Sequence, residues 1–172
     1  MDRHTVLKRA LDVILIGSMV YAGLMMFGVI RRGGSFEPGT PAPDFKVQSL
    51  ADGRTLTLAD FRGKTVLLDF FATTCPSCKA ELPDIEEYQR RAGDRLVALV
   101  ISTEDPATLK SFLAARNSNL AAAYDPGPAH SAYGVDTIPY LVVIDPEGRV
   151  QSDTIGSVRW KDILPWLPEE GE

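Results

Sequence analysis

Two cysteines, Cys75 and Cys78, are the residues of this chain best suited to covalent chemistry. They are separated by Pro76 and Ser77, follow the apolar run Thr65 to Phe71, and open a segment with helical character. Both sulfurs would therefore meet in a first helical turn and could close a small disulfide ring. Unpaired N–H groups and the helix dipole at a helix start favour a thiolate, the form that attacks disulfides. This position predicts that Cys75 is the nucleophile and that Cys78 attacks the resulting mixed disulfide.

Half of a zinc site and an inert structural bridge are two other interpretations of the cysteine pair. A structural zinc ion needs four ligands, and the sequence has no second cysteine pair. Of the two histidines, His4 precedes a long apolar segment, which leaves His130 as a nitrogen ligand. These observations favour redox chemistry, and we expect neither a metal nor a cofactor.

Two acidic residues lie close to the cysteines in sequence. Asp69 is inside the run TVLLDFF, where an ionised carboxylate is costly unless something pairs with it or uses it. The strand could place Asp69 beneath the cysteine turn, where it could exchange a proton with Cys78. Glu81 follows Cys78 by three residues and so shares its helix face. A strand-edge aspartate and a solvated helix glutamate are the alternative interpretations.

Ile138 and Pro139 precede the strand-like segment YLVVID. Proline at a strand start can mean only a missing ladder donor. A cis bond would instead turn the chain toward the dithiol and expose the backbone of Ile138. The sequence leaves both interpretations open, because most X–Pro bonds are trans.

Residues 1–32 differ in character from the rest of the chain. Val13 to Ile30 is an uncharged run of 18 residues. As a helix it would span about 27 Å, close to the hydrocarbon thickness of a bilayer. We predict an uncleaved signal anchor in the lipid bilayer, with cleavage after Ala22 as the alternative. Three basic residues precede the run and two close it, which favours a cytoplasmic amino terminus.

The remaining residues divide into a Gly/Pro-rich tether, 33–43, and a domain, 44–172. A hairpin is predicted around Asp52 and Gly53, between the strands 45–50 and 55–58. Buried strands, helices and two final strands then alternate. The expected strands are 65–71, 95–102, 140–145 and 149–155, and the expected helices are 76–92 (interrupted at Pro83), 105–116 and 157–165. This order predicts an α/β fold, a mixed sheet with helices on both faces.

Composition restricts the class of partner. The chain has 172 residues, of which 45% are hydrophobic and 24% charged, as in one globular domain with a short appendage. Acidic residues outnumber basic ones by 23 to 18. Nucleic acid is therefore not an expected partner, since it would require a basic face.

Several segments together resemble a known family. FFATTCPSCKAELP and, further along, YGVDTIPYLVVIDPEGRV are similar to the thioredoxin superfamily. With PAPDF, LADGRTLTL and LADFRGKTVLLDFFATTC, they resemble the membrane-anchored thiol-disulfide oxidoreductases of the TlpA/ResA type over residues 40–167. The resemblance implies a thioredoxin-like fold with an N-terminal β-hairpin.

The resemblance also implies roles for individual residues. Cys75 would attack and Cys78 would resolve, so that the two form the redox disulfide. Asp69 matches the buried acid of thioredoxin, and Glu81 matches the acid that the ResA branch places beside its disulfide. Pro139 would be the cis-proline.

The substrate would lie against the dithiol and the cis-proline. Ile138 would present its backbone to the bound peptide beside Pro139, and Thr74, Pro76 and Ser77 would border it. Thr74 stands where these families usually have tryptophan, so a flat aromatic surface is missing beside the site.

The resemblance implies a protein-disulfide reductase in the bacterial inner membrane, with its domain in the periplasm or outside the cell. Electrons would come from a membrane donor of the CcdA or DsbD kind. Apocytochrome c or a copper-site assembly protein would be the client. An oxidant that inserts disulfides is one alternative.

A copper-delivery module that uses His130 is another alternative. Copper-binding relatives space their cysteines by three residues rather than two, and His130 is predicted to be a solvated loop residue. A peroxiredoxin site would need proline and threonine where this chain has Leu68 and Ala72.

Overall fold

The computed structural model describes residues 9, 13–19, 21, 36–156 and 159–167. The chain divides into two compact units, residues 1–32 and residues 33–172. In the first unit, residues 13–19 are helical and exposed. No helix among the described residues is both long and apolar enough to cross a membrane. Residues 20 and 22–30 of the predicted membrane span lie outside the described residues.

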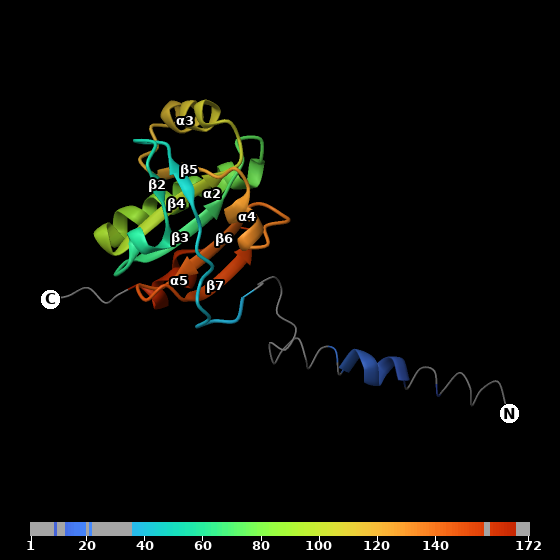
Figure 1. Cartoon of the computed structure of the whole chain (residues 1–172). Helices are drawn as coiled ribbons and strands as arrows, with labels where there is room; N and C mark the ends of the chain where they lie inside the picture. The colour runs from blue at the N-terminus through green and yellow to red at the C-terminus, as the bar shows by residue number, and fades with distance from the viewer. Residues whose placement is uncertain (1–8, 10–12, 20, 22–35, 157–158, 168–172) are drawn as a thin grey trace. The chain divides into compact units, whose positions relative to one another are not determined.

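In the second unit, the strands described form one mixed sheet in the order β2-β1-β5-β4-β3-β6-β7 (Figure 1). Strand β3 is parallel to β4, β4 is parallel to β5, and β6 is antiparallel to both β3 and β7. Strand β1 pairs antiparallel with β2, across Asp52 and Gly53, and with β5. The strands are β1 Val47–Ser49, β2 Thr55–Leu56, β3 Thr65–Phe70, β4 Leu96–Ser102, β5 Ala121–Tyr124, β6 Tyr140–Ile144 and β7 Val150–Ile155.

Helices cover both faces of the sheet, as predicted. One face packs against α2, α3 and α5, which contribute Leu82, Leu109 and Ile163 to a common core. The other face packs against α4 and the chain around Phe45 and Tyr133. The α-helices are α2 Pro76–Ala92, α3 Pro106–Ala115, α4 Pro128–Ala132 and α5 Trp160–Ile163, and the 3-10 turns are η1 Leu58–Phe61, η2 Gly93–Arg95 and η3 Leu164–Trp166.

Strand β3 lies inside the described sheet, between β4 and β6, and all six of its residues are buried. Alternation along the strand sends Leu67, Asp69 and Phe71 to the face covered by α2, and Leu68 and Phe70 to the face covered by α4. A strand buried on both faces has an almost continuous apolar sequence, which explains the run TVLLDF. Asp69 is the one acidic residue of this strand.

Helix α2 is continuous through Pro83, so the predicted interruption is wrong. Proline lacks the N–H group that would bond to the carbonyl four residues earlier, at Lys79. The Arg116 guanidinium donates to that carbonyl instead, at 3.5 Å. The carbonyl therefore keeps a partner and the helix runs on.

Three further differences from the predicted elements are local. Strand β5 was not predicted, since its sequence AAAY is short and alanine-rich. The closing helix is shorter than 157–165, with α5 spanning Trp160–Ile163 before a 3-10 turn. Residues 39–42, expected in the tether, bond to β7 and the turn before it: Gly39 N–H donates to Val150 at 2.7 Å, and Ala42 N–H to Gly148 at 3.0 Å.

Candidate active site

Cys75 and Cys78 form a disulfide at the amino terminus of α2, with their Cα atoms 5.3 Å apart. Cys75 is the N-cap residue, and its sulfur accepts the Cys78 backbone N–H at 3.2 Å. The hydroxyl of Ser77 lies 3.3 Å from the same sulfur. Cys75 is half-buried, whereas Cys78 is fully buried. A second molecule can therefore approach the sulfur of Cys75 but not that of Cys78.

The turn between β3 and α2 holds the first cysteine at the sheet edge. Phe71 N–H donates to Ile101 of β4 at 2.9 Å, which extends the ladder one residue beyond β3. Cys75 N–H then donates to Ala72 at 3.1 Å and closes a tight turn. Pro76 occupies the first helical position, where its fixed φ suits the helix and no N–H is needed.

Asp69 and Glu81 are both buried, with exposed fractions of 0% and 2%, so the solvated alternatives for these two residues are wrong. Their four carboxyl oxygens have no hydrogen-bond partner among the described residues. Burial, and secondly the charge of Glu81, raises the pKa of Asp69 well above its usual range. Burial, and secondly the charge of Asp84, raises the pKa of Glu81 to about 7. Both acids can thus hold a proton on the α2 side of the sheet, the side to which Cys78 belongs.

The peptide bond between Ile138 and Pro139 is cis, the geometry that the family resemblance implies. Tyr140 of β6 pairs in register with Phe70 of β3, so Pro139 lies at the edge where β3 turns toward Cys75. Pro139 is buried and Ile138 is half-buried. The strand pairing thus brings together two segments that are far apart in sequence.

The remaining residues predicted to contact the substrate border the same edge. Thr74, Pro76 and Ser77 surround Cys75 in sequence, and their side chains are exposed. The described structure therefore leaves the approach to Cys75 lined by small side chains.

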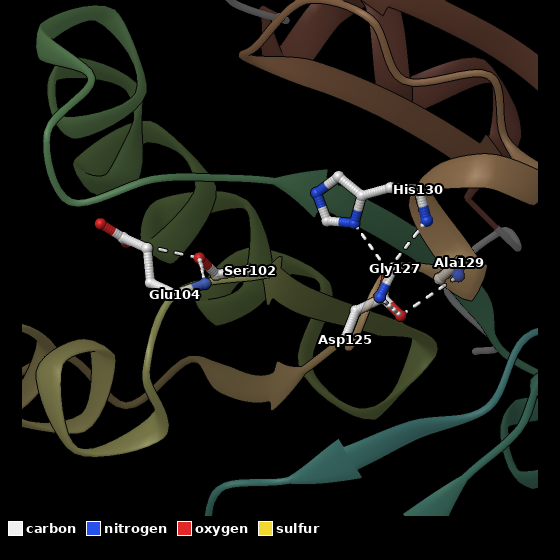
Figure 2. Close-up of polar contacts among 6 residues, drawn as sticks. All are labelled: Ser102, Glu104, Asp125, Gly127, Ala129 and His130. Atoms are coloured by element: carbon white, nitrogen blue, oxygen red, sulfur yellow. Dashed lines mark hydrogen bonds and ion pairs between the residues drawn. The ribbon is translucent and has the colours of Figure 1, made fainter.

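Sequence reasoning missed Glu104, which follows β4 at the same sheet edge. Its carboxylate accepts the Thr73 N–H at 2.6 Å and the Thr73 hydroxyl at 2.8 Å. Ser102 bonds to Glu104 through its hydroxyl, which donates to the carboxylate at 3.4 Å and accepts the Glu104 N–H at 3.2 Å (Figure 2). The signal available in the sequence was its place directly after a buried strand, because the carboxyl ends of parallel strands meet at one edge.

Sequence reasoning also missed Asp125, which follows β5 and is fully buried. It accepts backbone N–H groups from Gly127 at 3.0 Å, Ala129 at 3.2 Å and His130 at 2.9 Å (Figure 2). Burial alone would raise the pKa of Asp125, but the hydrogen bonds from His130 and the backbone outweigh it, and the pKa is lowered.

His130 was predicted to be a solvated loop residue, and this is wrong. It lies in α4, and its side chain is 18% exposed, with Nδ1 2.6 Å from the Asp125 carboxylate. Its ring also meets the Phe70 ring edge-on, with centroids 4.9 Å apart. The sequence DPGP is typical of a loop, so it does not indicate this arrangement. In the structure, Asp125 accepts backbone N–H groups at the start of the short helix α4. Among the described residues, no three or more His, Cys, Asp or Glu side chains are grouped to hold a metal ion.

The mixed sheet, the Cys-x-x-Cys disulfide at a helix amino terminus and the cis-proline define a thiol-disulfide oxidoreductase with a thioredoxin-like fold. Residues 38–153 match the model of the AhpC/TSA family. The chain belongs to that family.

Similar proteins agree with this class. The thiol-disulfide oxidoreductase ResA of Geobacillus thermodenitrificans is 32% identical, over 96% of this chain and 95% of its own. The exposed lipoprotein thioredoxin of Streptococcus pneumoniae has 33% identity and a TM-score of 0.62, over 71% of this chain and 96% of its own. A thiol:disulfide interchange protein of Chlorobium tepidum has 26% identity and a TM-score of 0.62, over 76% and 94%.

Proposed function

We propose that this oxidoreductase reduces disulfides of client proteins outside the cytoplasm, using Cys75 as nucleophile and Cys78 as resolving cysteine. The observation that carries the proposal is the asymmetry of the pair. Cys75 is half-buried at the start of α2, while Cys78 is fully buried on the side of the sheet that holds two carboxyl groups. An accessible nucleophile with a protected partner suits attack on a large substrate followed by release.

The reaction cycle transfers two electrons and two protons to the client. The Cys75 thiolate attacks one sulfur of the client disulfide, forms a mixed disulfide, and the other client sulfur leaves as a thiol after taking up a proton. The Cys78 thiolate then attacks the Cys75 sulfur, which releases the second client thiol. The protein is left with the Cys75–Cys78 disulfide that the structure contains.

Asp69 and Glu81 are proposed to handle the proton of Cys78. A thiol that is fully buried needs a nearby base before it can attack, because only the thiolate is nucleophilic. Glu81, with its pKa raised to about 7, can both accept and return a proton near neutral pH. Asp69 lies within electrostatic reach of Glu81 and can share the proton with it.

The direction of electron flow and the location of the domain complete the proposal. A reductase must be re-reduced, which calls for a membrane donor of dithiol electrons, of the CcdA or DsbD kind. Anchoring by Val13 to Ile30 would hold the domain on the outer side of the bacterial inner membrane, next to that donor. Apocytochrome c and copper-site assembly proteins are the proposed clients, as the resemblance to oxidoreductases of the TlpA/ResA type implies.

Trapping of the mixed disulfide tests the proposed roles. In Cys78→Ser protein the first attack proceeds but release does not, so a client disulfide protein should remain attached through Cys75. Non-reducing electrophoresis should show the adduct, and dithiothreitol should remove it. Cys75→Ser is the matched control and should form no adduct. An adduct formed through Cys78 alone would overturn the assignment of the nucleophile.

A further inference from the structure

Glu104 holds the loop that leads into Cys75. Both of its carboxyl oxygens accept from Thr73, one from the backbone N–H at 2.6 Å and the other from the hydroxyl at 2.8 Å. Thr73 stands two residues before Cys75, between the last β3–β4 ladder bond and the start of α2. Among the described contacts of this loop, Glu104 is the one charged side chain that makes two hydrogen bonds to it.

The carboxylate is itself fixed in place from behind. Ser102, the last residue of β4, is fully buried, and its hydroxyl bonds to both the backbone and the side chain of Glu104 (Figure 2). Position 104 is therefore tied to the central sheet, and through Thr73 it ties the cysteine loop to the same sheet. A half-buried carboxyl group is held in this way against the loop that precedes α2.

We propose that Glu104 is a positioning residue for disulfide exchange, which fixes the loop before Cys75 and holds a carboxylate against Thr73, two residues from that cysteine. The inference deepens the proposed function, because it takes Cys75 as the attacking sulfur. A fixed negative charge near a thiol disfavours its thiolate, whereas the helix amino terminus favours it. Glu104 thus acts against the helix amino terminus and limits how far the pKa of the Cys75 thiol is lowered.

Other charged groups lie around the dithiol. Asp69 on β3 and Glu81 on α2 are buried on the side of Cys78, and Lys79 is the next residue along the helix. Glu104 approaches instead from the loop after β4, through Thr73. Its effect should therefore be seen first in Cys75.

Glu104→Gln removes the charge and keeps the side-chain length and one acceptor oxygen. We expect the pKa of Cys75 in the reduced full-length protein, measured from the pH dependence of iodoacetamide alkylation, to fall by about half a unit or more. The reduction potential should become less negative, since a stabilised thiolate stabilises the reduced form. Glu147→Gln is the matched control, because Glu147 is exposed and follows β6, whose end pairs with the beginning of β3. That control should leave both quantities unchanged.

Thr73→Val separates this role from a purely structural one. It removes the hydroxyl that partly neutralises the carboxylate but keeps the negative charge. The pKa of Cys75 should then not fall, in contrast to its fall in Glu104→Gln. A fall in both variants, or no change in Glu104→Gln, would overturn the inference. These equilibrium measurements need no client, so they stand or fall separately from the proposed reductase activity.

Discussion

Asp69 and Glu81 are two buried carboxyl groups without a hydrogen-bond partner among the described residues, and the charge of Glu81 acts on Asp69. Burial of a carboxyl group without a hydrogen-bond partner lowers the stability of the fold. An apolar residue of similar size would fill the same space without that cost. Stability therefore does not explain these two acids, whereas their placement on the Cys78 side of the sheet suits a role in the reaction. A perturbed pair of titratable groups in a reactive site is the arrangement expected for proton transfer.

Glu81 should make the stability of the oxidised protein depend on pH. Its folded pKa is about 7, against 4.5 for the unfolded residue, so between these values the folded state holds a proton that the unfolded state has lost. The free energy of unfolding should therefore be highest below the unfolded pKa and fall as pH rises through the folded one, by about 3 kcal/mol.

Glu81→Gln should remove this contribution. Urea denaturation of the oxidised full-length protein at pH 4.5 and pH 8 measures it, with Glu147→Gln as an exposed control. The variant should gain stability relative to the wild type at pH 8, and little or none at pH 4.5. An equal difference at both values would mean that the carboxyl does not titrate in this window.

The sequence identifies those site residues whose neighbours in the chain already define their surroundings. The spacing of Cys75 and Cys78 by itself indicates a redox pair, and Asp69 is recognisable as the one acid in an apolar strand. Glu104 and Asp125 escape prediction because their partners come from other segments: Thr73 is 31 residues away, and the backbone groups around Asp125 form a cap that the sequence DPGP does not distinguish from a loop.

At the scale of elements, the start of helix α3 is predicted correctly from the local sequence. Asp105 accepts the Thr108 N–H at 3.0 Å as N-cap, and Pro106 occupies the next position, as Asp-Pro predicts. Asp105→Ala should cost about 1 kcal/mol of unfolding free energy by loss of the cap. Chemical denaturation measures this, and Asp105→Asn, which keeps a capping oxygen, should lie close to the wild type. Equal losses in the two variants would contradict a capping role.

Elements that depend on distant partners are harder to predict. Strand β5 has a sequence that favours no sheet by itself, and it forms because β4 and β1 pair with it on either side. Pro83 would end an isolated helix, but α2 continues through it, and Arg116 from the end of α3 donates to the freed carbonyl. In both cases tertiary contacts override the local preference.

At the scale of the whole molecule, the proposed anchor would determine the side of the membrane on which the domain works. Three basic residues before Val13 and two after Ile30 favour a cytoplasmic amino terminus. A fusion at Glu172 to a reporter that is active only outside the cytoplasm should therefore be active. Activity of a cytoplasm-only reporter alone at the same position would contradict this topology. A variant lacking residues 1–32 serves as the control and should lose export.

The reduction potential is the property in which all these groups act together. Asp69 and Glu81 lie on the Cys78 side, and Glu104 contacts the loop that leads to Cys75, so each acid disfavours a thiolate when ionised. A disfavoured dithiolate makes the reduced form less stable, which lowers the reduction potential of the Cys75–Cys78 couple.

A glutathione titration with alkylation of the pair should therefore give a reduction potential near −270 mV, as for thioredoxin, and not near the −120 mV of a strong oxidant. Asp69→Asn should shift the value upward at a pH where Asp69 is ionised, because it removes a negative charge on the Cys78 side. A wild-type value near −120 mV would instead mean that electrons flow from client thiols to this protein, which would then insert disulfides.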